Sequence, residues 1–204
     1  MKNTLIINAG QSFAHSGGAF NTTLTGWTQN LLATHPDLAV QVTHVSQAYD
    51  PDEEVRKFVW ADLIIYHTPV WWFQLPHGFK TYLDQVLTAG HQQGLYHSDG
   101  RSRINPAINY GTGGTLHGRH YLLTTSWNAP SEAFTLPGEF FGERSVDEGV
   151  MFGFHRMNAF IGLAPLPSYH FHDIEKNADL VRDKAGYQDH LQRVLTEWLA
   201  PGPA

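Results

Sequence analysis

Three large aromatic side chains follow one another directly after a predicted buried strand. Residues 63–66 (LIIY) are typical of a strand that is covered on both faces, and Pro69 ends it. Trp71, Trp72 and Phe73 then stand where a surface loop would normally be polar. Such rings can stack on a flat ligand, or they can fill a core or a subunit contact. The run by itself allows both interpretations.

The loop after the first predicted strand has the composition of a phosphate site. Residues 4–8 (TLIIN) form that strand, and residues 9–21 are rich in small residues. A helical pattern then begins near Asn21 or Thr22, either of which can cap a helix. Free backbone N–H groups and the helix dipole would face a bound anion there. Neither the G-x-G-x-x-G nor the G-x-x-x-x-G-K-[ST] fingerprint is present, so an ordinary turn remains an alternative.

A third loop adds a polar edge. Residues 121–125 (YLLTT) predict a strand, and Ser126, Trp127 and Asn128 follow it. In a flavodoxin-like sheet the carboxyl ends of these three strands are neighbours at the topological switch point. A phosphate pocket, an aromatic wall and an amide edge would then share one site. A flavin needs this combination, because its isoalloxazine ring is flat, amphipathic and tuned by hydrogen bonds.

Other chemistries have weaker support. The pair His170 and His172 lies on one face of a predicted strand and is followed by Asp173, but a solvated or packed pair explains it better than a metal site. Ser126 lacks the G-x-S-x-G elbow of a hydrolase nucleophile. The absence of cysteine excludes disulfides, thiolate nucleophiles and Cys-based metal sites. We therefore expect no bound metal.

Length and composition indicate the size and class of the protein. With 204 residues, of which 42% are hydrophobic and 16% charged, the chain can bury one good core, so we expect a single domain over residues 1–204. A net charge of −6 gives no basic surface for nucleic acid. No apolar run is long enough for a signal peptide or a membrane span, so we expect a cytoplasmic protein.

Strands and helices alternate along the chain. After the first strand and helix we expect a strand at 38–45, a helix capped by Asp50, the strand at 63–66, a helix around Phe79 and Tyr82, the strand at 121–125, a helix at 150–160, a strand at 167–171 and a helix at 180–198. This order predicts an α/β fold, a flavodoxin-like doubly wound sheet of five parallel strands with helices on both faces. Residues 89–118 lack periodicity and form a long excursion, which is typical of functional loops.

Four groups of loop residues match a known family. They are His15-Ser16 with Phe20-Asn21, residues 68–73 (TPVWWF) with Pro76, Tyr110-Gly111 with Gly113-Gly114, and residues 127–130 (WNAP) with 132–134 (EAF). On these motifs the chain resembles the flavodoxin-like NAD(P)H:quinone oxidoreductases, in the branch of the bacterial modulator of drug activity B, which is related to DT-diaphorase. The resemblance implies FAD rather than FMN, NADPH as the favoured donor, a homodimer with sites at its interface, and a role in oxidative stress.

The same resemblance assigns parts of the site. The FAD pyrophosphate and ribityl region would contact Ser16, Gly18, Ala19, Phe20, Asn21 and Thr23, the isoalloxazine would contact Pro69, Val70, Trp71, Trp72 and Phe73, and the polar edge would be Ser126, Trp127, Asn128 and Ala129. Tyr110 would be a further contact and a candidate for the substrate pocket, on an excursion that we expect to roof it. Phe140 and Phe141 add to more rings than one subunit covers, which also favours a dimer.

The implied reaction is a two-electron reduction of quinones. Hydride would pass from the nicotinamide to the flavin and then to the quinone, without a catalytic side chain. If the aromatic run covers one face of the ring, both substrates use the other face, and catalysis is ping-pong. Two alternatives remain: an FMN-dependent azoreductase or nitroreductase, and a flavin-binding electron carrier that is not an enzyme.

Overall fold

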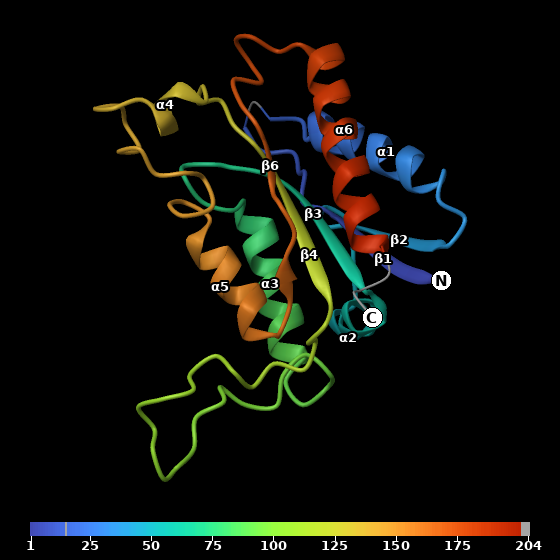
Figure 1. The fold of residues 1–204 in the computed structure, drawn as a ribbon, viewed down its shortest axis with the longest axis vertical. Helices are drawn as coiled ribbons and strands as arrows, with labels where there is room; N and C mark the ends of the chain where they lie inside the picture. Colours follow the sequence, from blue (N-terminus) through green and yellow to red (C-terminus); the bar gives the residue numbers. More distant parts are fainter. Residues whose placement is uncertain (15, 201–204) are drawn as a thin grey trace.

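A parallel β-sheet forms the centre of the computed structural model, which describes residues 1–14 and 16–200 (Figure 1). The strands are β1 (Lys2–Asn8), β2 (Leu38–His44), β3 (Leu63–Pro69), β4 (His120–Ser126), β5 (Ala164–Pro165) and β6 (Tyr169–Phe171). Their order is β2-β1-β3-β4-β5, and β6 pairs with β4. Every pairing is parallel, which confirms the predicted flavodoxin-like α/β architecture.

The fifth position of the sheet is filled by two short strands instead of one. Ala164 pairs with His120 at the start of β4, and Phe171 pairs with Ser126 at its end. The sequence predicted a single strand at 167–171. Pro165 and Pro167 have no N–H group to donate, so a continuous ladder cannot form across this segment.

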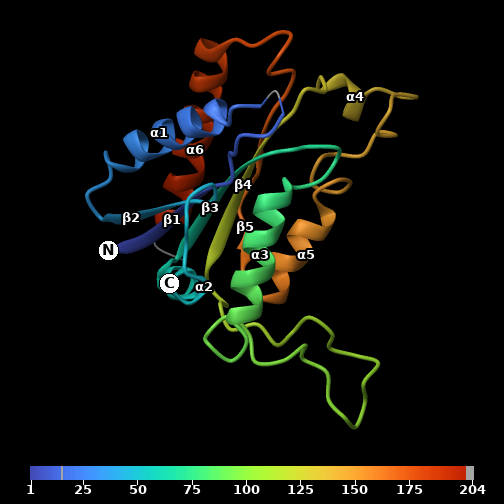
Figure 2. The ribbon, with the colours of Figure 1, turned by 180° about the vertical axis from the view of Figure 1, so that it is seen from behind.

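Helices cover both faces of the sheet (Figures 1 and 2). On one face α1 (Ala19–Leu32) and α6 (Leu180–Leu199) pack on Ile6, Ile65 and Leu122. On the other face lie α2 (Pro51–Trp60), α3 (His77–Ala89), α4 (Glu132–Thr135) and α5 (Phe152–Phe160). The alternation of strand residues between the two cores explains why β1 and β3 read as unbroken apolar runs. The short helix α4 was not predicted.

Helix starts differ in how well the sequence predicts them. At α2 the prediction is confirmed, because the Asp50 carboxylate accepts the backbone N–H groups of Asp52 and Glu53 at 2.8 and 3.1 Å. At α1 the prediction of a cap at Asn21 or Thr22 is wrong. The helix begins at Ala19, after Gly18 in a left-handed conformation (φ 69°), and no side chain caps it. A glycine turn therefore starts this helix, and its first N–H groups receive no side-chain partner.

The excursion between α3 and β4 extends away from the carboxyl ends of the strands (Figures 1 and 2). It leaves the carboxyl end of α3 and returns to the amino end of β4. The expectation that it roofs the pocket of its own chain is therefore wrong. Within the described part of the chain, no helix has both the length and the apolar character needed to cross a membrane.

Candidate functional site

The carboxyl ends of β1, β3 and β4 meet at one edge of the sheet. Asn8 stands opposite His67, Pro69 stands opposite Ser126, and the Val70 N–H donates to the Ser126 carbonyl at 3.1 Å. Beside these ends lies a cavity of about 480 Å³. It is lined by Phe13, Ala14, Ser16, Val70, Trp71, Trp72, Phe73, Trp127, Asn128, Ala129 and Glu175. Residues from all three predicted loops therefore share one cavity.

Two tight turns form the aromatic wall of this cavity. Phe13 and Ser16 exchange both backbone hydrogen bonds at 2.9 Å, and Trp71 and Gln74 do so at 3.0 Å. The rings of Phe13 and Trp71 stack across the two turns, with centroids 5.2 Å apart. Each turn thus presents a flat side chain to the other.

The turn at Trp72 and Phe73 is strained. Both residues have positive φ angles, 48° and 62°, a conformation that Asn and Gly normally supply in two-residue turns. Trp72 is 89% exposed, whereas Phe73 stacks on Phe140 at 5.3 Å. Trp72 is therefore not core filler. Strain and exposed apolar area at one position are typical of a binding site or an interface.

The amino end of α1 lies at the same edge of the sheet. Gly18, Ala19 and Asn21 supply the first helical turn without a side-chain cap, as an anion site requires. The Nδ2 atom of Asn21 is buried and has no hydrogen-bond partner among the described residues. Thr23 is exposed on the next turn.

Three of the predicted site residues lie behind the cavity and not in its lining. Phe20 packs its ring on Phe171 at 5.0 Å, in the core between β6 and α1, so its side chain supports the helix. Pro69 is buried and ends β3. The Ser126 hydroxyl at the end of β4 is buried, and no described residue bonds to it. Unpaired buried polar atoms are rare, so those of Asn21 and Ser126 indicate places for a ligand.

Tyr110 lies apart from these residues within the chain. It is 71% exposed on the excursion, 6.0 Å from the ring of Phe160 at the end of α5, and Arg101 lies over its face. The excursion that carries Tyr110 lies at the edge of the sheet opposite to the carboxyl ends of the strands (Figure 1). His15, which belongs to the first loop motif, lies outside the described residues.

The sequence interpretation missed three residues that line the cavity, Phe13, Ala14 and Glu175. Phe13 could have been found as the one aromatic residue between the first strand and Gly18. Glu175 follows β6 by four residues and had no signal, because its place depends on the path of the chain from β6 to α6.

Comparison with known proteins supports the fold and the family. A model of the family described as flavodoxin-like fold matches residues 2–195. NADPH:quinone oxidoreductase MdaB of Haemophilus influenzae is 42% identical over 193 residues, which are 95% of this chain and 99% of that protein. An uncharacterised protein of Schizosaccharomyces pombe is 45% identical over 191 residues, or 94% of this chain and 96% of that protein.

Solved structures give the same architecture. A candidate quinone reductase from Klebsiella pneumoniae has a TM-score of 0.74 at 21% identity, over 98% of this chain and 86% of that chain. General stress protein 14 of Treponema denticola, solved in complex with FMN, has a TM-score of 0.57 at 21% identity, over 98% and 96% of the two chains. At these identities the likeness concerns the fold alone.

The chain belongs to the flavodoxin-like fold family. Its resemblance to the quinone oxidoreductases of that family, inferred from loop motifs, is confirmed by the 42% identity to the Haemophilus influenzae protein over nearly the whole of both chains.

Proposed function

We propose that the protein is an FAD-dependent NAD(P)H:quinone oxidoreductase, with NADPH as the favoured donor. The observation that carries the proposal is the convergence of three loops in one cavity, with exposed flat rings on one side and the uncapped start of α1 nearby. The near full-length identity to the NADPH:quinone oxidoreductase of Haemophilus influenzae supports the same activity.

The residues present fit a flavin. The first turn of α1 offers backbone N–H groups to a pyrophosphate, and the unpaired Nδ2 of Asn21 is a further donor beside them. Trp71, Trp72 and Phe73 offer flat apolar surface to a ring, and the Ser126 hydroxyl can bond to its polar edge. Both kinds of contact are needed, because the ring is apolar on its faces and polar at its rim.

The chain binds and orients, while the flavin supplies the redox chemistry by accepting hydride from NAD(P)H and passing it to the quinone. The turn at Trp71 to Gln74 fixes the position of the wall through two backbone hydrogen bonds. A rigid wall holds a flat group in one orientation and excludes water from one of its faces.

Because this wall closes one face, both flat substrates must use the other. They cannot stack there together, so the oxidised nicotinamide leaves before the quinone enters. Catalysis is then ping-pong.

Two alternatives keep specific support. An FMN enzyme of the azoreductase type is favoured by the FMN complex of the Treponema denticola protein and by an azoreductase of Bacillus anthracis with a TM-score of 0.62 at 13% identity. A flavin-binding electron carrier that is not an enzyme is consistent with the fold alone.

One preparation tests the proposal. We expect the purified protein to be yellow, to release FAD on acid extraction, and to lose its visible absorbance when NADPH is added without oxygen. With quinone as the varied substrate, double-reciprocal plots at several NADPH concentrations are expected to be parallel. Extraction of FMN alone would favour the azoreductase type, absorbance that NADPH does not bleach would favour the carrier, and intersecting lines would contradict the shared face.

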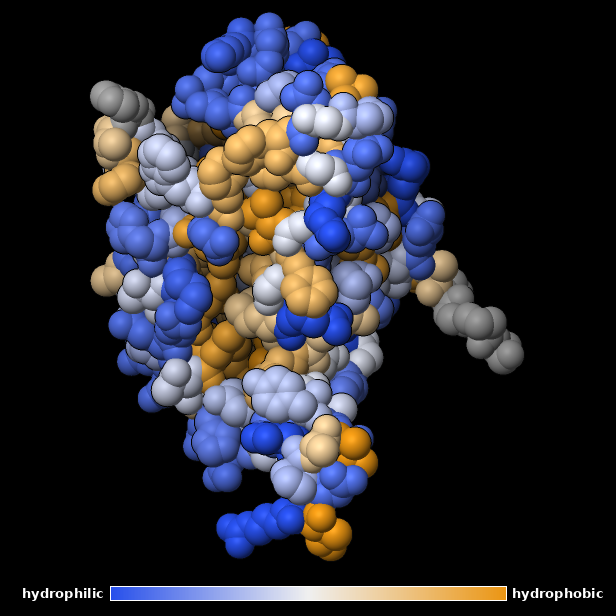
Figure 3. Space-filling model, turned by 90° about the vertical axis from the view of Figure 1, so that its left-hand side faces the viewer, coloured by the Kyte–Doolittle hydropathy of each residue, from blue (hydrophilic) through white to orange (hydrophobic). Residues whose placement is uncertain are grey.

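We also propose that the protein is a homodimer, in which Tyr110 contacts the site of the second copy. Tyr110 and the cavity lie at opposite edges of one chain, so Tyr110 can serve a cofactor only in a partner. An apolar groove of about 580 Å³ between α3 and α5, whose lining includes the partly exposed Leu87, Val150 and Met157, offers surface for that partner. Figure 3 views a face of the molecule with apolar side chains in a hollow between polar rims.

Light scattering tests the dimer. The protein is expected to have about twice the mass of the 22.9 kDa chain at micromolar concentration. Replacing the partly exposed Leu87 by Glu, which places a charge in the groove, is expected to give the mass of one chain, because an unpaired charge is costly in an apolar interface. Exchanging the exposed Lys184 for Glu serves as the control and should leave the mass unchanged. A single-chain mass for the unmodified protein at all concentrations would refute the dimer.

A further inference from the structure

A chain of hydrogen bonds leads from the cavity wall into a cluster of ionisable side chains behind it. The indole Nε1 of Trp127 lies 2.6 Å from the Thr125 hydroxyl, which lies 2.7 Å from Nδ1 of His170. The other nitrogen of His170 lies 3.3 Å from the Asp147 carboxylate. The same carboxylate oxygen lies 2.8 Å from Nε2 of His155.

The chain of hydrogen bonds ends at the hydroxyl group of a tyrosine. Nδ1 of His155 lies 2.6 Å from the Tyr121 hydroxyl, and burial raises the pKa of Tyr121 well above its ordinary value. The phenol is therefore neutral and donates its hydrogen to His155. The Nε2–H of His155 then donates to Asp147. Burial raises the pKa of Asp147, but the hydrogen bonds that its carboxylate accepts from His155 and His170 outweigh this effect and hold the pKa below its usual range.

The directions of the remaining bonds follow from the donors. Indole Nε1–H can only donate, so the Thr125 oxygen accepts from Trp127. The Thr125 hydroxyl hydrogen is then free to donate to Nδ1 of His170, and Nε2–H of His170 donates to Asp147. Each group has a defined donor or acceptor role, which gives His170 one tautomer and one orientation.

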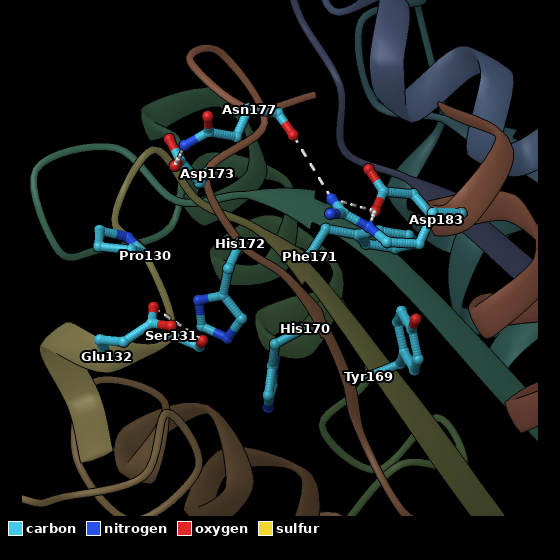
Figure 4. Close-up of a pocket in the computed structure, with 11 residues that line it drawn as sticks. Pro130, Ser131, Glu132, Tyr169, His170, Phe171, His172, Asp173, Asn177 and Asp183 are labelled. Carbon is cyan, nitrogen blue, oxygen red and sulfur yellow. Dashed lines mark hydrogen bonds and ion pairs between the residues drawn. The ribbon is translucent and has the colours of Figure 1, made fainter. Parts of the chain in front are cut away.

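The surroundings of His170 come from four elements. His170 stands on β6, Asp147 on the loop before α5, and His155 on α5, while His190 lies on α6. The ring of His172 is 6.5 Å away on the same side of the segment, and Glu132 of α4 lies beside His172 (Figure 4). Figure 4 also shows Asp183 on the opposite side of the cavity that His170 lines, and Arg182 lines the same cavity. Asp147 is the carboxylate in contact with His170.

We propose that His170, held by Asp147, is a positioning residue that fixes the Trp127 side chain in the wall of the cavity through Thr125. This inference rests on the proposed function only for its effect on the flavin. Trp127 is nearly fully buried and packs on Phe134, with ring centroids 5.0 Å apart. The hydrogen bond from its indole N–H to Thr125 therefore limits the rotation that packing still allows the ring. Asp147 meanwhile ties the loop that follows Phe140 and Phe141 to β6 and α5.

This chain of hydrogen bonds positions side chains and does not conduct protons. A proton path needs groups that can both accept and donate at each step, and the indole nitrogen has no acceptor site. The path therefore stops at Trp127, and His170 acts on the cavity by holding a ring.

The test follows the indole hydrogen of Trp127 in the purified protein labelled with ¹⁵N-tryptophan, with its signal assigned from Trp127→Phe. Thr125→Val removes the acceptor at nearly constant shape and is expected to speed indole exchange with solvent by about ten-fold or more, and His170→Leu by about three-fold. Thr125→Ser, which keeps the hydroxyl, should restore slow exchange. His190→Leu is the matched control, since its ring bonds to the Pro167 carbonyl and not to Thr125.

Flavin retention gives the second readout. Thr125→Val is expected to weaken flavin binding about ten-fold relative to Thr125→Ser. Unchanged indole exchange in His170→Leu would overturn the inference, whatever Thr125→Val does. Asp147→Asn, at a half-exposed position, replaces His170→Leu if that variant does not fold, with the same expected direction. If the unmodified protein retains no flavin, the proposed function fails, while the exchange rates still decide the role of His170.

Discussion

Acidification from pH 7 to pH 5 is expected to lower the free energy of unfolding by about 2 kcal/mol through one histidine, His67. This residue of β3 is fully buried, and burial lowers its pKa to about 3. Its two nitrogens lie 2.9 Å from the Thr28 hydroxyl and 2.6 Å from the Thr124 hydroxyl, and no described carboxylate bonds to it. The folded protein therefore holds the ring neutral.

The sign follows from proton binding. Below pH 6.5 the unfolded chain protonates this histidine and the folded protein does not, so stability falls as pH falls and continues to fall until about pH 3. Denaturant titrations from pH 7.5 to pH 4.5 measure this loss. His67→Gln keeps a donor and an acceptor but cannot titrate, so it should be less stable at pH 7 and have a flatter pH profile.

Other groups titrate in the same range, so the comparison of the two profiles is the measurement. Burial also lowers the pKa of His120, His172 and His190, and these contribute with the same sign in both proteins. A His67→Gln profile parallel to that of the unmodified protein would show that His67 is protonated when folded, which contradicts the buried neutral ring.

The sheet could be predicted because its signals are local. Residues 63–66 and 5–7 are consecutive apolar residues, since β3 and β1 have helices on both faces. The capping pattern at Asp50 is likewise contained in a few residues. Gly18 was missed as the start of α1, because its left-handed turn depends on the path of the first loop, while Asn21 and Thr22 fit the usual capping rule.

The parts of the site that depend on contacts between distant residues were harder to predict from the sequence. The grouping of three loops followed from the order of the strands, which the alternation of elements implies. The location of Tyr110 was mispredicted although the alternation of elements indicated it: its excursion joins a helix to the next parallel strand, so both ends of the excursion lie near the amino ends of the strands, away from the cavity. The contact of Asp147 with His155 and His170 joins residues 8 and 23 positions apart, and it depends on how the loop before α5 folds back on β6.

Replacing Trp72 by alanine is expected to weaken flavin binding by about 1 to 3 kcal/mol, or about 5-fold to 150-fold, because stacking and buried apolar area are lost. In the protein alone this side chain is 89% exposed, so its removal costs little packing. Equilibrium dialysis against FAD measures the change. Trp72→Phe keeps a flat ring and should stay within about three-fold of the unmodified protein.

The backbone conformation of Trp72 predicts a second effect: a glycine at this position should increase stability while it decreases flavin affinity. Trp72 has a φ of 48°, which costs about 1 kcal/mol for a residue with a side chain and little for glycine. Trp72→Gly should therefore raise the free energy of unfolding of the flavin-free protein while it weakens flavin binding as much as Trp72→Ala does. The two effects separate strain from recognition: a tryptophan that is kept in a strained turn with 89% of its surface exposed is explained by a ligand that stacks on it. If the Trp72→Ala protein keeps its full FAD through dialysis, the Trp72 ring is not part of the proposed site. If the Trp72→Gly protein has unchanged stability, the turn at Trp72 is not strained.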